Sequence, residues 1–434
     1  MATNFQEQFD KERPVAGPAF WQKLRREGLE RFSALGFPTR RMEEWKYTGV
    51  QDIAEGEFRL AKDKELANFT LEEMHRLAFS ILPGPRLVFL NGFFHPVLSD
   101  LSGLPAGVKV KSLAQALLEE PSRIEAVLGS RVKVKNRAFA ALNAAFLSDG
   151  AFICLSPNTE VKAPIQLLFV SRSNGQATIS HPRVLIQAEA GSKASVIETY
   201  VGAGSYFTNA VTEILVGEGA QLEHVKLQGE SEAAFHVASI AVHQDRDSRY
   251  ANHSISLGAA LARHDIETVL DAEGAFGALN GLYMVTGKQH VDHHTNIEHA
   301  KPHGGSAELY KGILDGQSQA VFDGRILVQP DAQQTSSQQT NKNLLLSDEA
   351  LVNTKPLLEI FANDVKCSHG ATIGRLDENQ VFYLRSRGIE QTLARSLLTY
   401  AFASDLLAAL PHEPLRERLK GLIFSRLMPG KEAA

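Results

Sequence analysis

The middle of the chain, from about residue 151 to 380, consists of short runs rich in Val, Ile, Thr and Phe that are broken by Gly, Asn and Asp. Examples of these runs are 165–170, 183–187, 195–201 and 210–216. Such runs are typical of β-strands, and no amphipathic helix of roughly 10 to 15 residues separates them. The pattern argues against a doubly wound α/β fold and predicts an all-β body.

Glycine turns recur between these strand-like runs. The tripeptides at 190–192, 218–220 and 273–275 place their glycines 28 and then 55 positions apart, close to one and two units of a single spacing. A turn that recurs every 20 to 30 residues or so is expected of stacked β coils. Hairpins in a large antiparallel sandwich would produce a similar pattern, so periodicity alone leaves both architectures open.

The first 150 residues read as a mainly helical N-terminal region. Helices are expected at about 20–36, 70–79, 113–118 and 137–147. A strand is expected at 86–90, followed by an Asn-Gly turn. Three regions are therefore expected, at 1–150, 151–380 and 381–434.

The C-terminal region, 381–434, returns to helical periodicity. One stripe contains Ile389, Leu393, Leu397 and Tyr400, and further apolar residues widen it around nearly the whole helix. Such a helix must be covered on almost every side, either by the body of the protein or by a partner. The sequence leaves that choice open. A second, less apolar helix is expected to begin near Pro414.

Composition excludes several classes of function. The 434 residues include 45 Lys and Arg against 50 Asp and Glu, a net charge of -5, which provides no overall attraction for nucleic acid or an anionic membrane. No apolar run is long enough to span a bilayer, and the first residues lack a secretion signal, so a cytoplasmic protein is expected. Neither a phosphate-binding P-loop nor a GxGxxG dinucleotide motif occurs.

The chain has only two cysteines, Cys154 and Cys367, which form neither a disulfide framework nor a CxxC motif. Cys367 and His369 stand two positions apart, so on a strand their side chains share one face. A thiolate and an imidazole suit iron, zinc or an iron–sulfur cluster. The alternative is a buried free cysteine beside an incidental histidine. A nucleophile–base pair is disfavoured, because Cα atoms roughly 6.5 to 7 Å apart hold the two groups too far from each other.

A histidine-rich segment at 288–303 is a second candidate. On a strand, His290, Asp292 and His294 face one side and His293 faces the other. The first three could bind zinc or iron on an outer face, or form a solvated or hydrogen-bonded surface. His293 is expected to be a hydrogen-bonded interior residue.

Several longer blocks carry a resemblance. They are FPTRRMEEWKYT at 37–48, SAELYKGIL at 306–314, FDGRILV at 322–328, the continuous run at 340–374 that contains KCSHGATIG, and FYLRSRGI at 382–389. The chain resembles the SufB/SufD family of the Suf iron–sulfur cluster assembly machinery, and its length and KCSHGATIG block are closer to the SufD subunit.

The resemblance implies a right-handed parallel β-helix core flanked by N-terminal and C-terminal α-helical regions. It implies a scaffold without catalytic turnover that pairs with SufB through the β-helix. Carried over by position, Cys367 and His369 would lie near the SufB interface, where the nascent cluster is built. The ABC ATPase SufC would dock on the C-terminal helices, at positions that match Arg385, Ile389, Leu393, Leu397 and Phe402.

A shared cluster fits the shortage of sulfur. A cluster usually needs four protein ligands, and this chain offers one candidate thiolate beside one imidazole. We therefore expect a transient iron–sulfur cluster completed by SufB, no tightly bound cofactor, and a packed core role for Cys154. ATP-driven movement of the nearby C-terminal helices is expected to open the interface. A homodimer is plausible for the isolated chain. A β-solenoid enzyme and a zinc protein using His290 and His294 remain as alternatives.

Overall fold

The computed structural model describes residues 2–11, 17–62, 66, 68–77, 82–132, 134–173 and 175–428. Its helices are α1 (Ala2–Lys11), α2 (Ala19–Leu35), η1 (Glu43–Trp45), α3 (Gln51–Glu55), α4 (Leu71–Leu77), α5 (Leu113–Glu119), α6 (Pro121–Glu125), η2 (Val134–Asn136), α7 (Ala138–Ala145), α8 (Glu378–Ser386), α9 (Gln391–Ala408) and α10 (Glu413–Leu427). Within these residues no helix is both long and apolar enough to cross a membrane.

The strands form two sheets. The first contains β1 (Arg59–Leu60), β4 (Val108–Ser112), β5 (Gly150–Leu155), β7 (Thr178–Ser180), β8 (Arg183–Ala188), β10 (Tyr206–Val216), β12 (Phe235–Gln244), β14 (Leu261–Leu270), β16 (His290–His299), β18 (Gln319–Val328) and β20 (Leu351–Ile360). The second contains β2 (Arg86–Leu90), β3 (Phe93–Phe94), β6 (Ile165–Arg172), β9 (Lys193–Ala203), β11 (Gln221–Gly229), β13 (Arg249–Ser256), β15 (Phe276–Val285), β17 (Gly305–Leu314), β19 (Thr335–Leu345) and β21 (Val365–Gly374).

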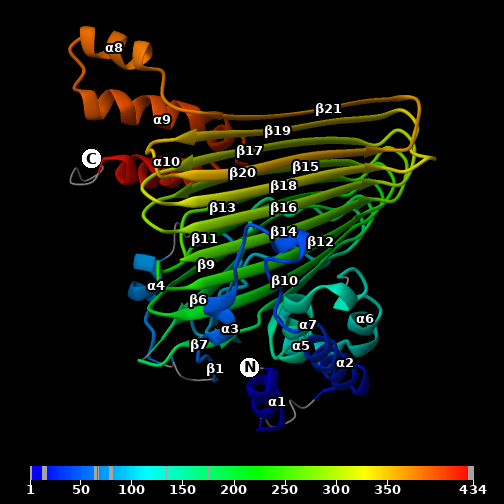
Figure 1. The fold of residues 1–434 in the computed structure, drawn as a ribbon. Helices are drawn as coiled ribbons and strands as arrows, with labels where there is room; N and C mark the ends of the chain where they lie inside the picture. The colour runs from blue at the N-terminus through cyan, green and yellow to red at the C-terminus, as the bar shows by residue number, and fades with distance from the viewer. Residues whose placement is uncertain are drawn as a thin grey trace.

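From β8 onward the chain alternates between the two sheets, so each strand pairs in parallel with the strand two places along (Figure 1). Val211 of β10, for example, lies beside Ser239 of β12, which is 28 positions later. The result is a parallel β-helix of about eight turns with helical regions at both ends of the chain. The parallel β-helix that the resemblance implies is confirmed, and of the two architectures that the glycine spacing leaves open the sandwich is excluded.

The recurrent glycines have the expected role. Gly191, Gly219 and Gly274 have φ values of 65°, 63° and 73°, in the left-handed region that residues with a Cβ rarely adopt. Each lies in a turn between strands, where the coil passes from one sheet to the other. Local turn chemistry therefore marked the repeat correctly.

The N-terminal helices lie against the early coils. Phe32 of α2, Phe139 of α7 and Phe146, which follows α7 as its C-cap, belong to an apolar cluster with Phe207 of β10, on the outer face of the first sheet. The expected helices at 20–36, 113–118 and 137–147 correspond to α2, α5 and α7, and the part of 70–79 that the structure describes is α4. This region also extends the sheets, because β2 pairs with β6 and β4 pairs with β5.

The C-terminal helices α9 and α10 pack on the outer face of the second sheet. Leu406 and Leu407 of α9 and Leu419 of α10 share an apolar cluster with strand residues such as Val225 and Ile255. Lys311 of β17 also binds α9, since its Nζ lies 2.7 Å from both carboxylate oxygens of Asp405. The body of the protein therefore covers much of the strongly apolar helix.

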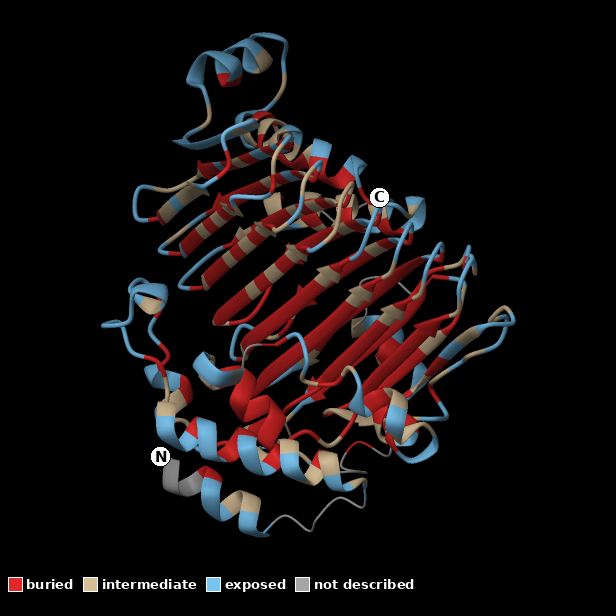
Figure 2. Ribbon diagram, turned by 90° about the vertical axis from the view of Figure 1, so that its right-hand side faces the viewer, coloured by how far each residue is buried: buried red, intermediate tan, exposed pale blue. Residues whose placement is uncertain are grey.

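The interior of the β-helix changes along its axis. The early coils are filled with apolar side chains such as Ile153 and Leu167. Later coils bury charged and polar groups between the sheets, including Glu198, Lys226 and His236. In Figure 2, the strands of the early coils are buried throughout, and exposed segments appear in the last ones. The polar interior thus leads toward the end of the solenoid formed by β20 and β21.

Candidate functional site at the open end of the solenoid

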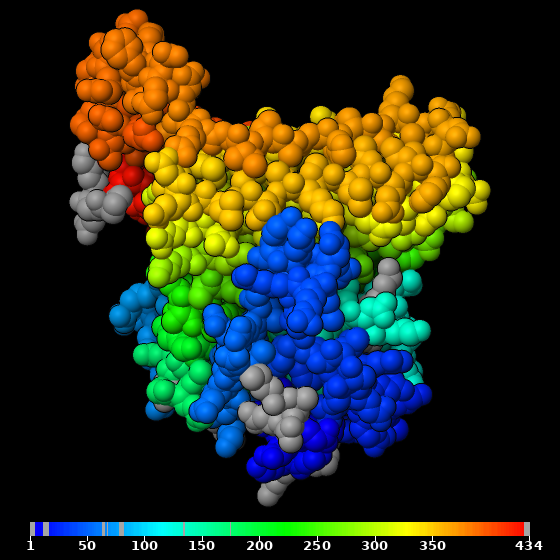
Figure 3. Space-filling model, viewed as in Figure 1, coloured from blue at the N-terminus to red at the C-terminus, as the bar shows by residue number. Residues whose placement is uncertain are grey.

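The solenoid ends at β20 and β21 without a covering element. Within the described part of the chain, β20 pairs only with β18 and β21 pairs only with β19, which leaves one edge of each strand without a neighbour. Apolar side chains are exposed here, with Leu351 at 50%, Phe361 at 61% and Ile373 at 51%. Figure 3 shows this end along the upper rim of the molecule. Unpaired strand edges beside exposed apolar groups are typical of a surface that another chain covers.

Cys367 and His369 lie on β21 at this end. Cys367 is in register with Ser337 of β19, and His369 is in register with Gln339. Ser337 and Gln339 are both buried, while their neighbours Ser336 and Gln338 are exposed. Because side chains alternate along a strand, Cys367 and His369 both belong to the interior face. The two-residue spacing therefore brings thiol and imidazole to one face, as expected.

The two side chains differ in exposure. Cys367 is half-buried and packs against the interior core, whereas His369 is exposed. Burial raises the pKa of the Cys367 thiol, and a hydrogen bond from the backbone of Ser337 opposes that rise only in part. The thiol is consequently a modest nucleophile in the isolated chain and needs a metal ion or a base to become a thiolate.

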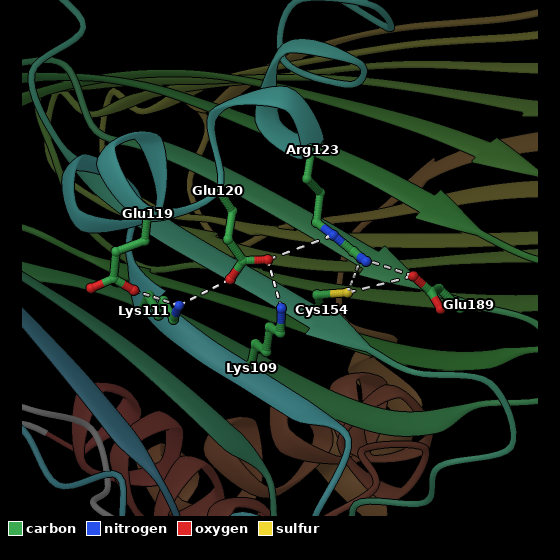
Figure 4. Close-up of polar contacts among 7 residues, drawn as sticks. All are labelled: Lys109, Lys111, Glu119, Glu120, Arg123, Cys154 and Glu189. Atoms are coloured by element: carbon green, nitrogen blue, oxygen red, sulfur yellow. Dashed lines mark hydrogen bonds and ion pairs between the residues drawn. The ribbon is translucent and has the colours of Figure 1, made fainter. Parts of the chain in front are cut away.

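Cys154 has a different environment (Figure 4). It lies on β5 among apolar side chains that include Leu117 and Phe152, and it is 2% exposed. Arg123 donates a hydrogen bond to its sulfur at 2.9 Å and also contacts Glu189 at 2.9 Å. Burial raises the pKa of the thiol despite the nearby guanidinium. The expected packed core thiol is confirmed, with the addition of an arginine contact.

Selective labelling should separate the two thiols. Neither is in a disulfide, and only Cys367 is appreciably accessible. We expect a maleimide reagent to modify the native monomer once, at Cys367, and to leave Cys154 unmodified until the protein unfolds. Intact mass spectrometry of the wild type and of Cys367→Ser measures this directly. Rapid labelling of native Cys367→Ser would contradict the expectation.

The histidine-rich segment does not form a metal site. His290, Asp292 and His294 lie on the face of β16 opposite to the interior Val291 and Ile297. Residues 37–50, which we name the strap, cross this outer face of the sheet (Figures 1 and 3). Thr48 of the strap hydrogen-bonds both His290, at 2.9 Å, and Asp292, at 2.5 Å. The described residues contain no group of three His, Cys, Asp or Glu that could hold a metal ion. The zinc alternative is therefore not supported.

Asp292 is instead the centre of a buried ion-pair network. Arg263 lies 2.7 Å from its carboxylate and His294 lies 3.0 Å from it. Burial raises the pKa of Asp292, but these cationic partners outweigh burial and hold the pKa well below its ordinary range. Trp45 of the strap covers the network, with the Arg263 guanidinium 3.7 Å from its ring centroid. The network thus anchors the strap to the solenoid.

His293, the interior member of the segment, is buried and stacks on His264 at a centroid distance of 4.8 Å. Burial lowers its pKa to about 3, so its ring is neutral. Neither ring nitrogen has a hydrogen-bond partner among the described residues. The interior position was predicted correctly, but the expected hydrogen bond is not formed.

The C-terminal helices present a second exposed surface. Of the residues expected to dock an ATPase, Arg385 is exposed, and Ile389, Leu393, Leu397 and Phe402 are half-buried. Two neighbours on α8 were not among the predicted docking residues, Phe382 and Tyr383, which are 70% and 57% exposed. The signal in the sequence is the pair of adjacent aromatic residues. On α8 only Val381 is buried.

Proximity in sequence did not predict proximity in space. Cys367 lies near the start of β21, and α8 follows its end. Seven strand residues, at about 3.3 Å each, separate Cys367 from Gly374 by roughly 23 Å. The C-terminal helices therefore lie beyond the opposite end of the strand from the thiol, and any movement of the helices would have to act through β21.

Comparisons with known proteins cover nearly the whole chain. The family model described as SUF system FeS cluster assembly, SufBD core domain, matches residues 169–402, and the SufBD protein N-terminal region matches residues 5–167. The iron–sulfur cluster assembly protein SufD of Escherichia coli is 34% identical, with 93% of this chain and 92% of that protein aligned. A SufBD family protein of Synechocystis is 37% identical over 91% of this chain and 88% of its own. The chloroplastic protein ABCI7 of Arabidopsis thaliana is 31% identical over 93% and 86%.

Proposed function

Because this chain belongs to the SufBD family of iron–sulfur cluster assembly proteins, we propose that it is a non-catalytic scaffold subunit that builds a nascent cluster jointly with a SufB-like subunit. The observation that carries the proposal is the position of Cys367 and His369 on the interior face of the last strand, at the uncovered end of the solenoid. A partner that covers this end would meet both side chains.

The ligand count supports a shared cluster. Iron–sulfur clusters take four protein ligands, usually thiolates, and imidazole can replace some of them. This end provides one thiol and one imidazole, so the partner must supply the other ligands. A site divided between two chains opens when the chains move apart, which suits a scaffold that has to release its product.

The open strand edges support pairing through the β-helix. β20 and β21 each have an unpaired row of backbone N–H and C=O groups, which a strand of another chain can continue. The exposed Phe361 and Ile373 add apolar surface to the same end. A second copy of this chain offers the same edges, so we propose a homodimer when the SufB-like subunit is missing.

The C-terminal helices are the proposed docking surface for a SufC-like ABC ATPase. Phe382 and Tyr383 on α8 extend the surface formed by Arg385, Ile389, Leu393, Leu397 and Phe402. Arg395 of α9 pairs with Glu378 at 3.0 Å and holds α8 against α9. The proposed compartment is the cytoplasm, where free thiols persist.

Reconstitution of the complex tests the scaffold proposal. We expect His369→Ala and Cys367→Ser each to lower the iron and acid-labile sulfide bound to the complex of this chain, the SufB-like subunit and the ATPase. The reason is that each substitution removes one of the two candidate ligands. The readout is metal and sulfide analysis after anaerobic purification.

The matched control is Cys154→Ser, which alters the other cysteine far from the open end and should leave the cluster content unchanged. If His369→Ala and Cys367→Ser retain the full cluster content in an intact complex, the cluster is not built on these two residues and the proposal is wrong.

A further inference from the structure

Two polar columns run beneath the candidate ligands, inside the β-helix. Cys367 is in register with Ser337, which is in register with Ser306 one coil further in. Strands in a sheet are about 4.8 Å apart, so side chains in one register column on one face lie directly above one another. Each candidate ligand therefore lies next to a specific polar residue of the preceding coil.

The column beneath Cys367 is closed by hydrogen bonds. The hydroxyls of Ser337 and Ser306 are 2.7 Å apart, and Ser306 is 2.9 Å from Nε2 of His299. All three residues are buried. Both serine hydroxyls beneath Cys367 therefore have hydrogen-bond partners before any partner subunit or metal arrives.

The column beneath His369 is incomplete. His369 stands over Gln339, and Gln339 stands over Glu308. Nε2 of Gln339 donates a hydrogen bond to Oε2 of Glu308 at 2.7 Å. Gln339 is 1% exposed, and its carbonyl oxygen Oε1 has no partner within the described residues. Leaving a buried carbonyl oxygen unpaired destabilises the fold, so a donor is to be expected for it.

The chain makes room for this amide. A Cβ added at Gly324, on the opposite sheet, would lie 2.4 Å from Nε2 of Gln339. Any larger residue at this position would therefore displace the side chain of Gln339. With Nε2 committed to Glu308, the amide cannot turn over without losing that bond, and Oε1 is the atom left to accept a hydrogen bond.

We propose that Gln339 is a positioning residue for His369, which accepts a hydrogen bond from one ring nitrogen of His369 when a partner covers the open end and so leaves the other nitrogen free for iron. The inference rests on the proposed function. While the open end is uncovered, His369 is exposed. Histidines that bind metal almost always donate their other ring N–H to an oxygen acceptor, which fixes tautomer and orientation.

Glu308 acts one step further from the cluster. It is 2% exposed, and burial raises its pKa to about 7. The ionised carboxylate only accepts hydrogen bonds and so holds Nε2 of Gln339 toward it, whereas the protonated carboxyl can also donate to Oε1 of a turned amide. A glutamine in its place could present either its oxygen or its nitrogen, and would hold the amide less firmly.

Substitution of Gln339 by methionine tests the proposal, because methionine is similar in length and lacks the acceptor. The complex of this chain, the SufB-like subunit and the ATPase is loaded with cluster, and the rate of cluster loss to a chelator is measured. We expect Gln339→Met to lose cluster about 10 to 100 times faster than the wild type. Pulsed EPR of the reduced cluster should also show an altered or weakened ¹⁴N coupling from the imidazole.

The control is Gln338→Met, the same substitution at the exposed neighbour on the same strand, which should behave as wild type in both measurements. If Gln339→Met fails to fold, Glu308→Gln decides the matter, since the proposal predicts a smaller change in the same direction and is wrong if both readouts stay unchanged.

His369→Ala separates this inference from the proposed function. If His369→Ala loses the cluster and Gln339→Met retains it with unchanged ¹⁴N coupling, the positioning role is overturned and the scaffold function stands. If neither variant changes the cluster, both proposals fail.

Discussion

Replacing Arg183 with methionine is expected to lower the free energy of unfolding by about 3 to 5 kcal/mol. Arg183 of β8 and Glu213 of β10 are both 0% exposed, with Nη2 and Oε1 2.5 Å apart. Glu213 also accepts the backbone N–H groups of Gly129 and Arg131. Without the guanidinium, the Glu213 carboxylate remains buried with only neutral donors. Urea unfolding followed by circular dichroism measures the loss.

Two controls define the cause of that loss. Arg246→Met removes an exposed pair with Glu273 and should cost no more than about 1 kcal/mol. The double variant Arg183→Met with Glu213→Leu removes both buried charges and should recover much of the stability, because no unpaired charge is left. An Arg183→Met protein as stable as the wild type would show that this buried pair does not stabilise the contact between Glu213 and the segment that contains Gly129 and Arg131.

The strands and turns of the solenoid could be predicted from sequence because their signal is local. Strand-like runs and glycine turns follow from backbone preferences of a few residues, and the turns at Gly191 and Gly219 have the positive φ that glycine permits. The choice of a β-helix over a sandwich depends on which strands pair, so local signal left it open and the family resemblance supplied it. The same locality explains why the boundaries of α2, α5 and α7 lie close to the predicted ones.

Contacts between distant segments could not be predicted. Trp45 of the strap covers Arg263, which is more than 200 positions away. The sequence therefore left the outer histidine face open between a metal site and a solvated or hydrogen-bonded surface, and the structure shows a hydrogen-bonded one. Likewise, nothing in the sequence around Asp405 indicates its ion pair with Lys311. Which distant segment covers a given face depends on the whole fold, so the periodicity of one segment cannot indicate it.

The polar interior was hidden for a related reason. β19 reads TSSQQTNKNLL, which looks like a solvated strand. Four of its polar residues are nevertheless buried, because they face the inside of the solenoid, where polar groups hydrogen-bond to one another: Ser337, Gln339, Asn341 and Asn343. Cys367 and His369 could be selected by their chemistry, whereas the residue that we propose to orient His369 became visible only through its register and its unpaired oxygen.

Introducing charge at the open end should abolish assembly without unfolding the chain. Phe361 and Ile373 are exposed, so Phe361→Asp and Ile373→Lys remove little buried surface from the isolated protein. In a covered interface each new charge would be desolvated without a partner, at a cost of several kcal/mol. We expect the Kd for the SufB-like subunit to rise at least about 100-fold in the double variant, which corresponds to about 2.7 kcal/mol. Isothermal titration calorimetry gives this value.

Self-association should respond in the same way, because a second copy would use the same edges. Light scattering on the isolated double variant is expected to give the mass of a monomer. Leu118→Asp on α5, where Leu118 is 64% exposed, is the matched control and should leave both associations intact. Wild-type affinity in the double variant would place the partner on another surface. The unpaired edges of β20 and β21 would then need a different cover, since long uncovered edges promote aggregation.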